Sequence, residues 1–138
     1  MADEGADEEP SVDWALVAGS GSYLAGAAGG VYVSYLLAPA GDAAGDRIAL
    51  RIAAGVAGGT LASATAVYVA DGFSGNLPAL IGGALAGQAA GLGVAAGFVL
   101  LDVVFGGRQP GFSGLGLTVV LGMPFYATLG AQYANGTL

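Results

Sequence analysis

Charged residues divide this chain into long apolar stretches. Beyond residue 13 the charged positions are Asp42, Asp46, Arg47, Arg51, Asp71, Asp102 and Arg108. The uncharged runs cover 28 residues (14–41), 19 residues (52–70), 30 residues (72–101) and 30 residues (109–138). A helix needs about 20 mainly apolar residues to cross the roughly 30 Å hydrocarbon core of a membrane. Each run is long enough for one crossing and too short for two, so the pattern predicts four spanning helices.

We place the four spans near residues 14–37, 47–70, 77–101 and 114–134. The connections contain helix-breaking signals, for example Pro39 and the glycine pair at 106–107. The expected fold is an all-α integral membrane protein, a compact bundle of four transmembrane helices. Residues 14–138 would form this membrane domain. Residues 1–13 would form an acidic tail, which is too charged to bury a core and is expected to be disordered.

The third run is built almost wholly of glycine and alanine between Gly82 and Gly97. In water each glycine costs a helix about 1 kcal/mol relative to alanine, but in lipid an unfolded backbone has no hydrogen-bond partners, so the helix persists. Glycines four residues apart then offer a smooth face on which a second helix can pack closely. The glycines expected to form such packing faces are Gly26, Gly30, Gly55, Gly59, Gly83, Gly87, Gly91, Gly93 and Gly97.

Two polar side chains and one proline stand out within or beside the spans. Gln88 lies mid-span, where an amide is costly unless it is hydrogen-bonded. It is expected to clasp neighbouring helices, and the alternative is a contact with a pore or a substrate. Asp102 would suggest ion coupling if it were deep in the bilayer, but we expect it at the surface, facing Arg108 or Arg51. Pro124 removes a helix hydrogen bond and is expected to kink the fourth span.

The basic residues predict the orientation of the chain in the membrane. Arg47 and Arg51 belong to the first connection and Arg108 to the third, and basic residues mark the cytoplasmic side. Both termini and the connection at 71–76 are therefore expected on the opposite side. The acidic opening of the chain is the reverse of a secretory signal, whose first region is basic, so we expect the first span to remain as an uncleaved anchor.

Composition excludes most enzymatic chemistry. The chain has no His and no Cys, and its three basic residues are all Arg. It therefore lacks an imidazole ligand, a thiolate nucleophile and a lysine for Schiff-base chemistry. We expect no catalytic residue, no cofactor and no metal site, and the formal net charge of −7 argues against nucleic-acid binding. Asn135-Gly-Thr137 matches the glycosylation acceptor pattern, but such short matches are common.

The whole chain is 55% hydrophobic and 9% charged, with a mean hydropathy of +0.73. The absence of Lys beside abundant Asp, Glu, Ala and Gly is similar to the composition of halophilic archaeal proteins, and we expect a prokaryotic cell membrane as the location.

Three classes of function fit this pattern. The favoured one is a structural or accessory multi-pass membrane protein, whose partners are the lipid bilayer and either further copies of itself or other membrane proteins. The alternative is a small channel or transporter that uses Gln88 and the Pro124 kink, and only this class requires an ion or a small molecule. The third class is a β-barrel or a glycine-rich soluble fold.

Overall fold

The computed structural model describes residues 13–38, 44–105 and 110–138, and within them the chain forms helices and no strand. The helices are α1 (Trp14–Leu37), α2 (Ala44–Ala70), α3 (Leu77–Val104), α4 (Pro110–Leu121) and α5 (Met123–Asn135). Except for Asp13, the predicted acidic tail lies outside the described residues.

The first three helices follow the predicted spans closely. Helix α1 begins at Trp14, where the Asp13 side chain caps it by accepting a hydrogen bond from the backbone N–H of Leu16 at 3.0 Å. Helix α2 begins three residues before the predicted span, and α3 continues to Val104. Among the described residues, two helical segments are long and apolar enough to cross a membrane, Arg47–Ala70 and Leu77–Val104.

The fourth predicted span is two helices rather than one kinked helix. Gly122 separates α4 from α5, and its carbonyl accepts the first backbone bonds of α5, from Phe125 (2.9 Å) and Tyr126 (3.1 Å). Pro124 lies in the first turn of α5, where its missing N–H costs nothing. With 12 and 13 residues, neither helix alone reaches the length of about 20 residues that a crossing requires.

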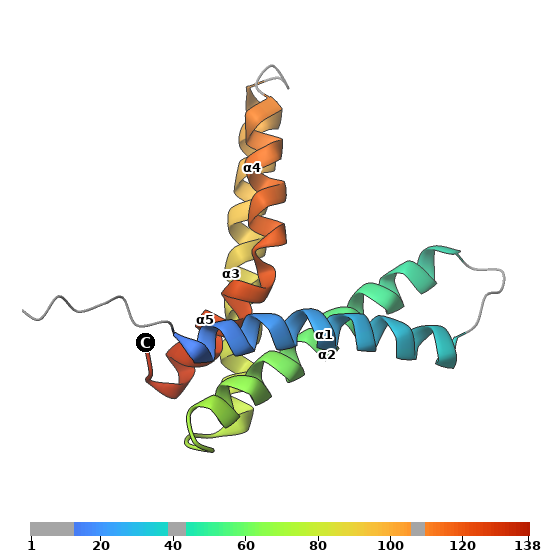
Figure 1. Ribbon diagram of the computed structural model, residues 1–138. Helices are drawn as coiled ribbons and strands as arrows, with labels where there is room; N and C mark the ends of the chain where they lie inside the picture. The colour runs from blue at the N-terminus through green and yellow to red at the C-terminus, as the bar shows by residue number, and fades with distance from the viewer. Residues whose placement is uncertain (1–12, 39–43, 106–109) are drawn as a thin grey trace, which may run out of the picture.

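The helices form two antiparallel pairs that meet and then diverge (Figure 1). One pair is α1 with α2. In the other, α3 packs against α5 along its first part and against α4 along its second part. Helix α5 also contacts α1 and α2, whereas α4, in the described chain, contacts only α3 and α5. The predicted compact bundle of four transmembrane helices is therefore not confirmed, because the break at Gly122 lets α4 follow α3 away from the first pair.

Glycines allow the closest approach within each pair. A Cβ on Gly26 of α1 would collide with the carbonyl oxygen of Gly58 on α2, and a Cβ on Gly58 would collide with that of Gly26. Gly83 of α3 and Gly130 of α5 have the same reciprocal relation. The two crossings thus share one local arrangement, in which each helix presents a backbone carbonyl to a glycine of its partner. A side chain at any of these four positions would force the helices apart.

Helix α2 ends in a Schellman motif that turns the chain toward α3. Gly72 has φ +68°, its N–H donates to the Val69 carbonyl (3.1 Å), and the Phe73 N–H donates to the Tyr68 carbonyl (2.8 Å). The rings of Phe73 and Tyr68 meet edge to face, with centroids 5.6 Å apart. The motif brings the start of α3 back beside the end of α2.

Candidate functional site

A cluster of buried polar side chains lies where the two helix pairs meet. We call it the polar junction; its members are Tyr23 of α1, Thr60 and Ser63 of α2, Gln88 of α3 and Thr128 of α5. Each side chain is at most 6% exposed. The adjoining hydrophobic core is rich in alanine and consists of Ala64, Val67, Leu80, Ala84, Ala127 and Ala131 together with Tyr23. Four helices therefore contribute to a single polar site.

Gln88 connects three of these helices. The Tyr23 hydroxyl donates to Gln88 Oε1 (3.2 Å), and Gln88 Nε2 donates to Thr60 Oγ1 (2.6 Å). Thr60 in turn donates its single proton to the carbonyl oxygen of Val56 (2.7 Å). The hydrogen bonds therefore run in one direction, from α1 through α3 to the backbone of α2. From its position on α3, the Gln88 side chain therefore bonds to both α1 and α2.

Thr128 forms the second centre of the junction. Its hydroxyl donates to the Pro124 carbonyl oxygen (2.8 Å), and because it has only one proton it must accept from its other partners. Those partners are the hydroxyls of Ser63 (3.0 Å) and Ser20 (3.4 Å). Gly19 lies directly against the Thr128 side chain, which explains why α1 can come this close. Thr128 thus fastens α5 to both α1 and α2.

The groups of the polar junction are suited to holding helices together. Its groups are hydroxyls and one amide, and both chains of hydrogen bonds end on backbone carbonyls, which do not take up a proton. No carboxylate or arginine belongs to it. Among the described residues, no group of three or more His, Cys, Asp or Glu side chains could hold a metal ion.

The structure places most of the predicted packing glycines at helix contacts. Gly26, Gly30, Gly83 and Gly87 face a backbone carbonyl of the partner helix, and Gly55, Gly59 and Gly91 face a side chain. Gly93 and Gly97 have no atom of the described residues within 4 Å of a Cβ built on them. The spacing of the glycines changes after Gly91, from four residues to two, and this turns the later pair away from α5.

The predicted charged candidates lie apart from the junction. Arg51 packs over the ring of Tyr35, 3.7 Å from its centre, within the α1–α2 pair. Asp102 lies in the last turn of α3, on the arm that diverges from that pair (Figure 1). Arg51 lies on the other helix pair and Arg108 lies outside the described residues, so the expected pairing of Asp102 with Arg108 or Arg51 stays a prediction.

A second polar arrangement holds the last turn of α5. Gln132 Nε2 donates to Asp13 Oδ2 (2.8 Å), and Asn135 Nδ2 donates to Asp71 Oδ2 (2.6 Å). We call these four residues the terminal clamp. Asn135 belongs to the glycosylation pattern, and here its amide nitrogen is engaged by a carboxylate. The clamp ties the end of α5 to the start of α1 and to the end of α2.

The clamp stabilises the ionised form of one of its carboxylates. The hydrogen bond from Gln132, and after it the backbone N–H of Leu16, lower the pKa of Asp13 below its ordinary value of 3.8. A lowered pKa in the folded state means that this contribution to stability is present above the ordinary pKa. It is lost as the pH falls through the lowered value. Asp13 therefore carries its charge under neutral conditions.

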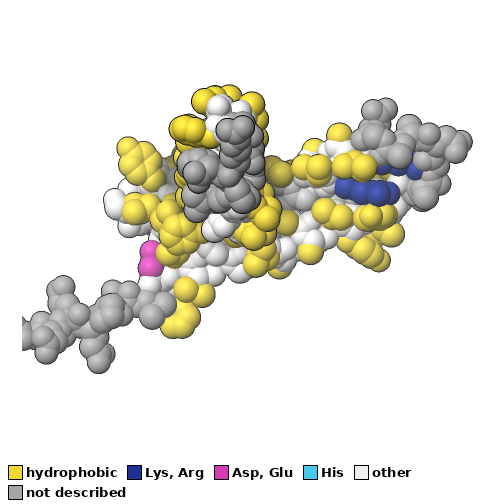
Figure 2. All heavy atoms as spheres, turned by 90° about the horizontal axis from the view of Figure 1, so that it is seen from above, with side chains coloured by type: hydrophobic (Ala, Val, Ile, Leu, Met, Phe, Trp, Pro, Cys, Tyr) yellow, Lys and Arg dark blue, Asp and Glu magenta, His cyan; other side chains and the backbone are white. Residues whose placement is uncertain are grey.

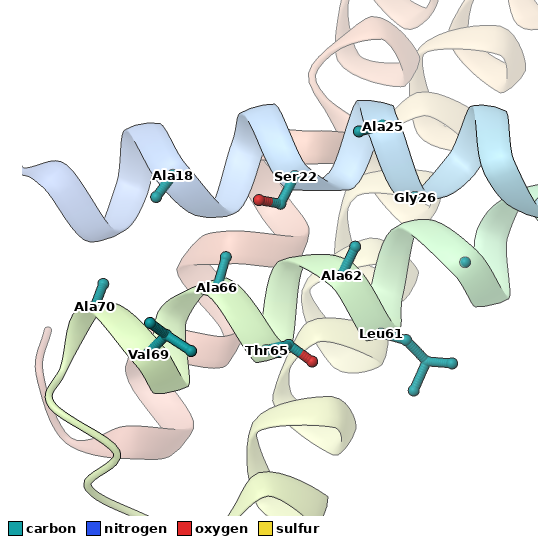
Figure 3. Close-up of a pocket in the computed structure, with 11 residues that line it drawn as sticks. Ala18, Ser22, Ala25, Gly26, Leu61, Ala62, Thr65, Ala66, Val69 and Ala70 are labelled. Atoms are coloured by element: carbon teal, nitrogen blue, oxygen red, sulfur yellow. The ribbon is translucent and has the colours of Figure 1, made fainter.

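An open groove of about 790 Å³ lies on the α1–α2 pair. Figure 3 shows its lining, which includes Ala18, Ser22, Leu61 and Thr65 and has no ionisable group. A second cavity of about 410 Å³ lies on α3 and α5 and includes Gly83 and Gly87. Neither includes a residue of the polar junction.

Comparisons with protein families, with curated proteins and with solved structures find no match to this chain. Fold and site define its class only broadly, as a protein that is helical in its described part and has there two helices long and apolar enough to cross a membrane.

Proposed function

We propose that this chain is a structural or accessory multi-pass membrane protein, without enzymatic activity, cofactor or catalytic metal. In this proposal α4 and α5 together make the fourth span, and the glycine crossings and the polar junction hold the four spans together. The bundle serves an assembly in the membrane through contacts with lipid and with further copies or other membrane proteins. The observation that carries the proposal is the distribution of polar and apolar side chains.

That distribution is unusual for a water-soluble protein, because polar side chains are prominent inside and large hydrophobic ones outside. The largest fully buried side chains are two hydrophobic ones, Leu80 and Val67, and three polar ones, Gln132, Thr128 and Ser63. Large hydrophobic side chains instead cover the outside, as in Figure 2. Water would penalise such a surface, because monomeric soluble proteins rarely expose extended apolar patches. Lipid favours it, and lipid also strengthens the reason for pairing every polar group inside.

The arrangement of the helix ends supports the proposed orientation. The terminal clamp joins the start of α1, the end of α2 and the end of α5, so these ends lie together. The described basic residues, Arg47 and Arg51, lie near the start of α2, at the other end of the α1–α2 pair. Under the positive-inside rule the clamp faces outward. Both termini would then lie outside a prokaryotic cell membrane.

Cysteine labelling tests the four-span layout, because the native chain has no cysteine. We expect Ser74→Cys and Ala43→Cys, each in liposome-reconstituted protein, to react with a membrane-impermeant maleimide from opposite sides. Ser74 lies in the exposed connection between α2 and α3. Full labelling in detergent is the control for access. Labelling of both positions from the same side would contradict the layout.

Replacement of Gln88 separates the structural role from a channel or transporter. Gln88→Leu deprives the buried Tyr23 hydroxyl of its acceptor and removes the clasp, so we expect it to lower the free energy of unfolding by about 2 kcal/mol. Ala89→Leu, on the exposed face of the same turn, is the matched control and should be nearly neutral. Liposomes containing the unaltered chain should show no ion flux above empty liposomes. A flux that Gln88→Leu abolishes would favour the channel.

A further inference from the structure

One atom of the terminal clamp has an unmet need for a hydrogen-bond donor. Gln132 is 2% exposed, and its Nε2 is committed to Asp13. Its Oε1 is buried and has no partner among the described residues. A flip of the amide would not help, because it would turn the oxygen toward a carboxylate. A buried acceptor of this kind is costly unless a donor or a cation approaches it.

The surroundings of this oxygen favour positive charge. Asp13 keeps its charge beside Gln132, and Asp71 is held on the neighbouring turn by Asn135. The helix dipoles largely offset one another, because α1 and α3 begin at this end while α2 and α5 finish there. The described arginines lie at the far end of the α1–α2 pair (Figure 2). The clamp therefore combines two carboxylates with no basic side chain of the described residues nearby.

We propose that Gln132 Oε1 and the Asp13 carboxylate bind a monovalent alkali cation such as Na⁺. The Oε1 and Nε2 atoms of Gln132 are bonded to the same carbon, so Oε1 lies close to the Asp13 carboxylate that Nε2 contacts. Oxygen atoms are the ligands that hard cations prefer, and the single negative charge of this pair matches the charge of one monovalent ion. In transporters with discontinuous membrane helices, Na⁺ is coordinated by unwound backbone carbonyls and by the C-terminal ends of half-helices, and Gln132 lies in the last turn of the short helix α5.

A bound cation would strengthen the clamp between α5 and α1. The site is independent of the structural role proposed above, since a cation could bind whether or not the bundle serves an assembly. Trp14, the chain's single tryptophan, follows Asp13 directly and provides a local fluorescence signal.

The experiment compares NaCl with choline chloride at equal ionic strength in detergent-purified protein. We expect the unfolding temperature of the unaltered chain to rise by about 4 °C more in NaCl, with a saturable change in Trp14 fluorescence. Gln132→Met keeps the size of the side chain but removes the oxygen, and it should abolish the difference between the salts. Tyr133→Phe, on the exposed side of the same turn, should retain it.

Gln132→Glu provides a second measurement if the methionine variant does not fold. It places a second carboxylate beside Asp13, so we expect it to be less stable in choline and more responsive to Na⁺ than the unaltered chain. Equal stability of the unaltered chain in both salts would overturn the site. So would a Na⁺ response that survives in Gln132→Met, or one that Gln132→Glu does not increase.

Discussion

Adding one methyl group at Gly83 is expected to lower the free energy of unfolding by about 3 kcal/mol, whereas the same change at Gly82 should stabilise the chain by up to about 1 kcal/mol. A Cβ on Gly83 would strike the Gly130 carbonyl and come within 2.6 Å of the Ala134 Cβ. Neither is a flexible side chain that can move aside, so α3 and α5 must separate. A Cβ on Gly82 meets nothing within 4 Å, and alanine favours a helix.

The measurement is reversible unfolding of Gly83→Ala and Gly82→Ala in mixed micelles, followed by circular dichroism. The pair is closely matched, because adjacent glycines on one helix receive the same substitution and differ only in what they face. Gly26→Ala and Gly29→Ala repeat the comparison at the α1–α2 crossing, where Gly26 faces the Gly58 carbonyl and Gly29 faces open space. Equal effects within either pair would show that the glycines do not control the helix crossings.

The sequence identifies the glycines of the first and third helices better than those of their partners. Repeats of four residues mark Gly83 and Gly87 on α3, and both face backbone carbonyls. On α2 the repeat marks Gly55 and Gly59, which meet side chains, while the backbone contact belongs to Gly58. Which side of a helix meets a partner depends on the rotation of both helices. A spacing within one helix does not contain that information.

The spacing of the glycines does not identify Gly130 as a contact position. It opposes Gly83, yet the fourth predicted span has no second glycine four residues away to mark it. A close approach needs only one small residue per helix at the point of contact, and the partner side can be an alanine such as Ala134. A pattern of paired glycines therefore does not mark Gly130.

The polar contacts were predictable only in part. A lone amide in an apolar span must be paired, and Gln88 is paired. Its partners, Tyr23 and Thr60, could not be chosen from the sequence, since many hydroxyls occur in the spans and those of Ser and Thr can instead bond to their own helix. The sequence predicted a kink at Pro124 and did not predict the division into two helices at Gly122, because a proline can either bend a helix or begin a new one.

Thr128→Val is expected to lower the free energy of unfolding by about 2–3 kcal/mol, although the two side chains have nearly the same shape. The substitution removes the acceptor of the Ser63 hydroxyl, which is fully buried, and weakens the contact with Ser20. It also leaves the Pro124 carbonyl without its side-chain donor. In a low-dielectric interior an unpaired hydroxyl costs more than the lost bond had contributed.

A double-mutant cycle with Ser63→Ala separates this cause from a packing defect. Ser63→Ala alone should cost about 1 kcal/mol, because it removes a donor and Thr128 still donates to Pro124. Added to Thr128→Val, it removes the hydroxyl that had been left unpaired, so the double variant should be no less stable than Thr128→Val alone. Strictly additive losses would mean that the two hydroxyls do not depend on each other. The junction would then fasten the helices by packing alone, and its hydrogen bonds would contribute little to holding α5 against α2.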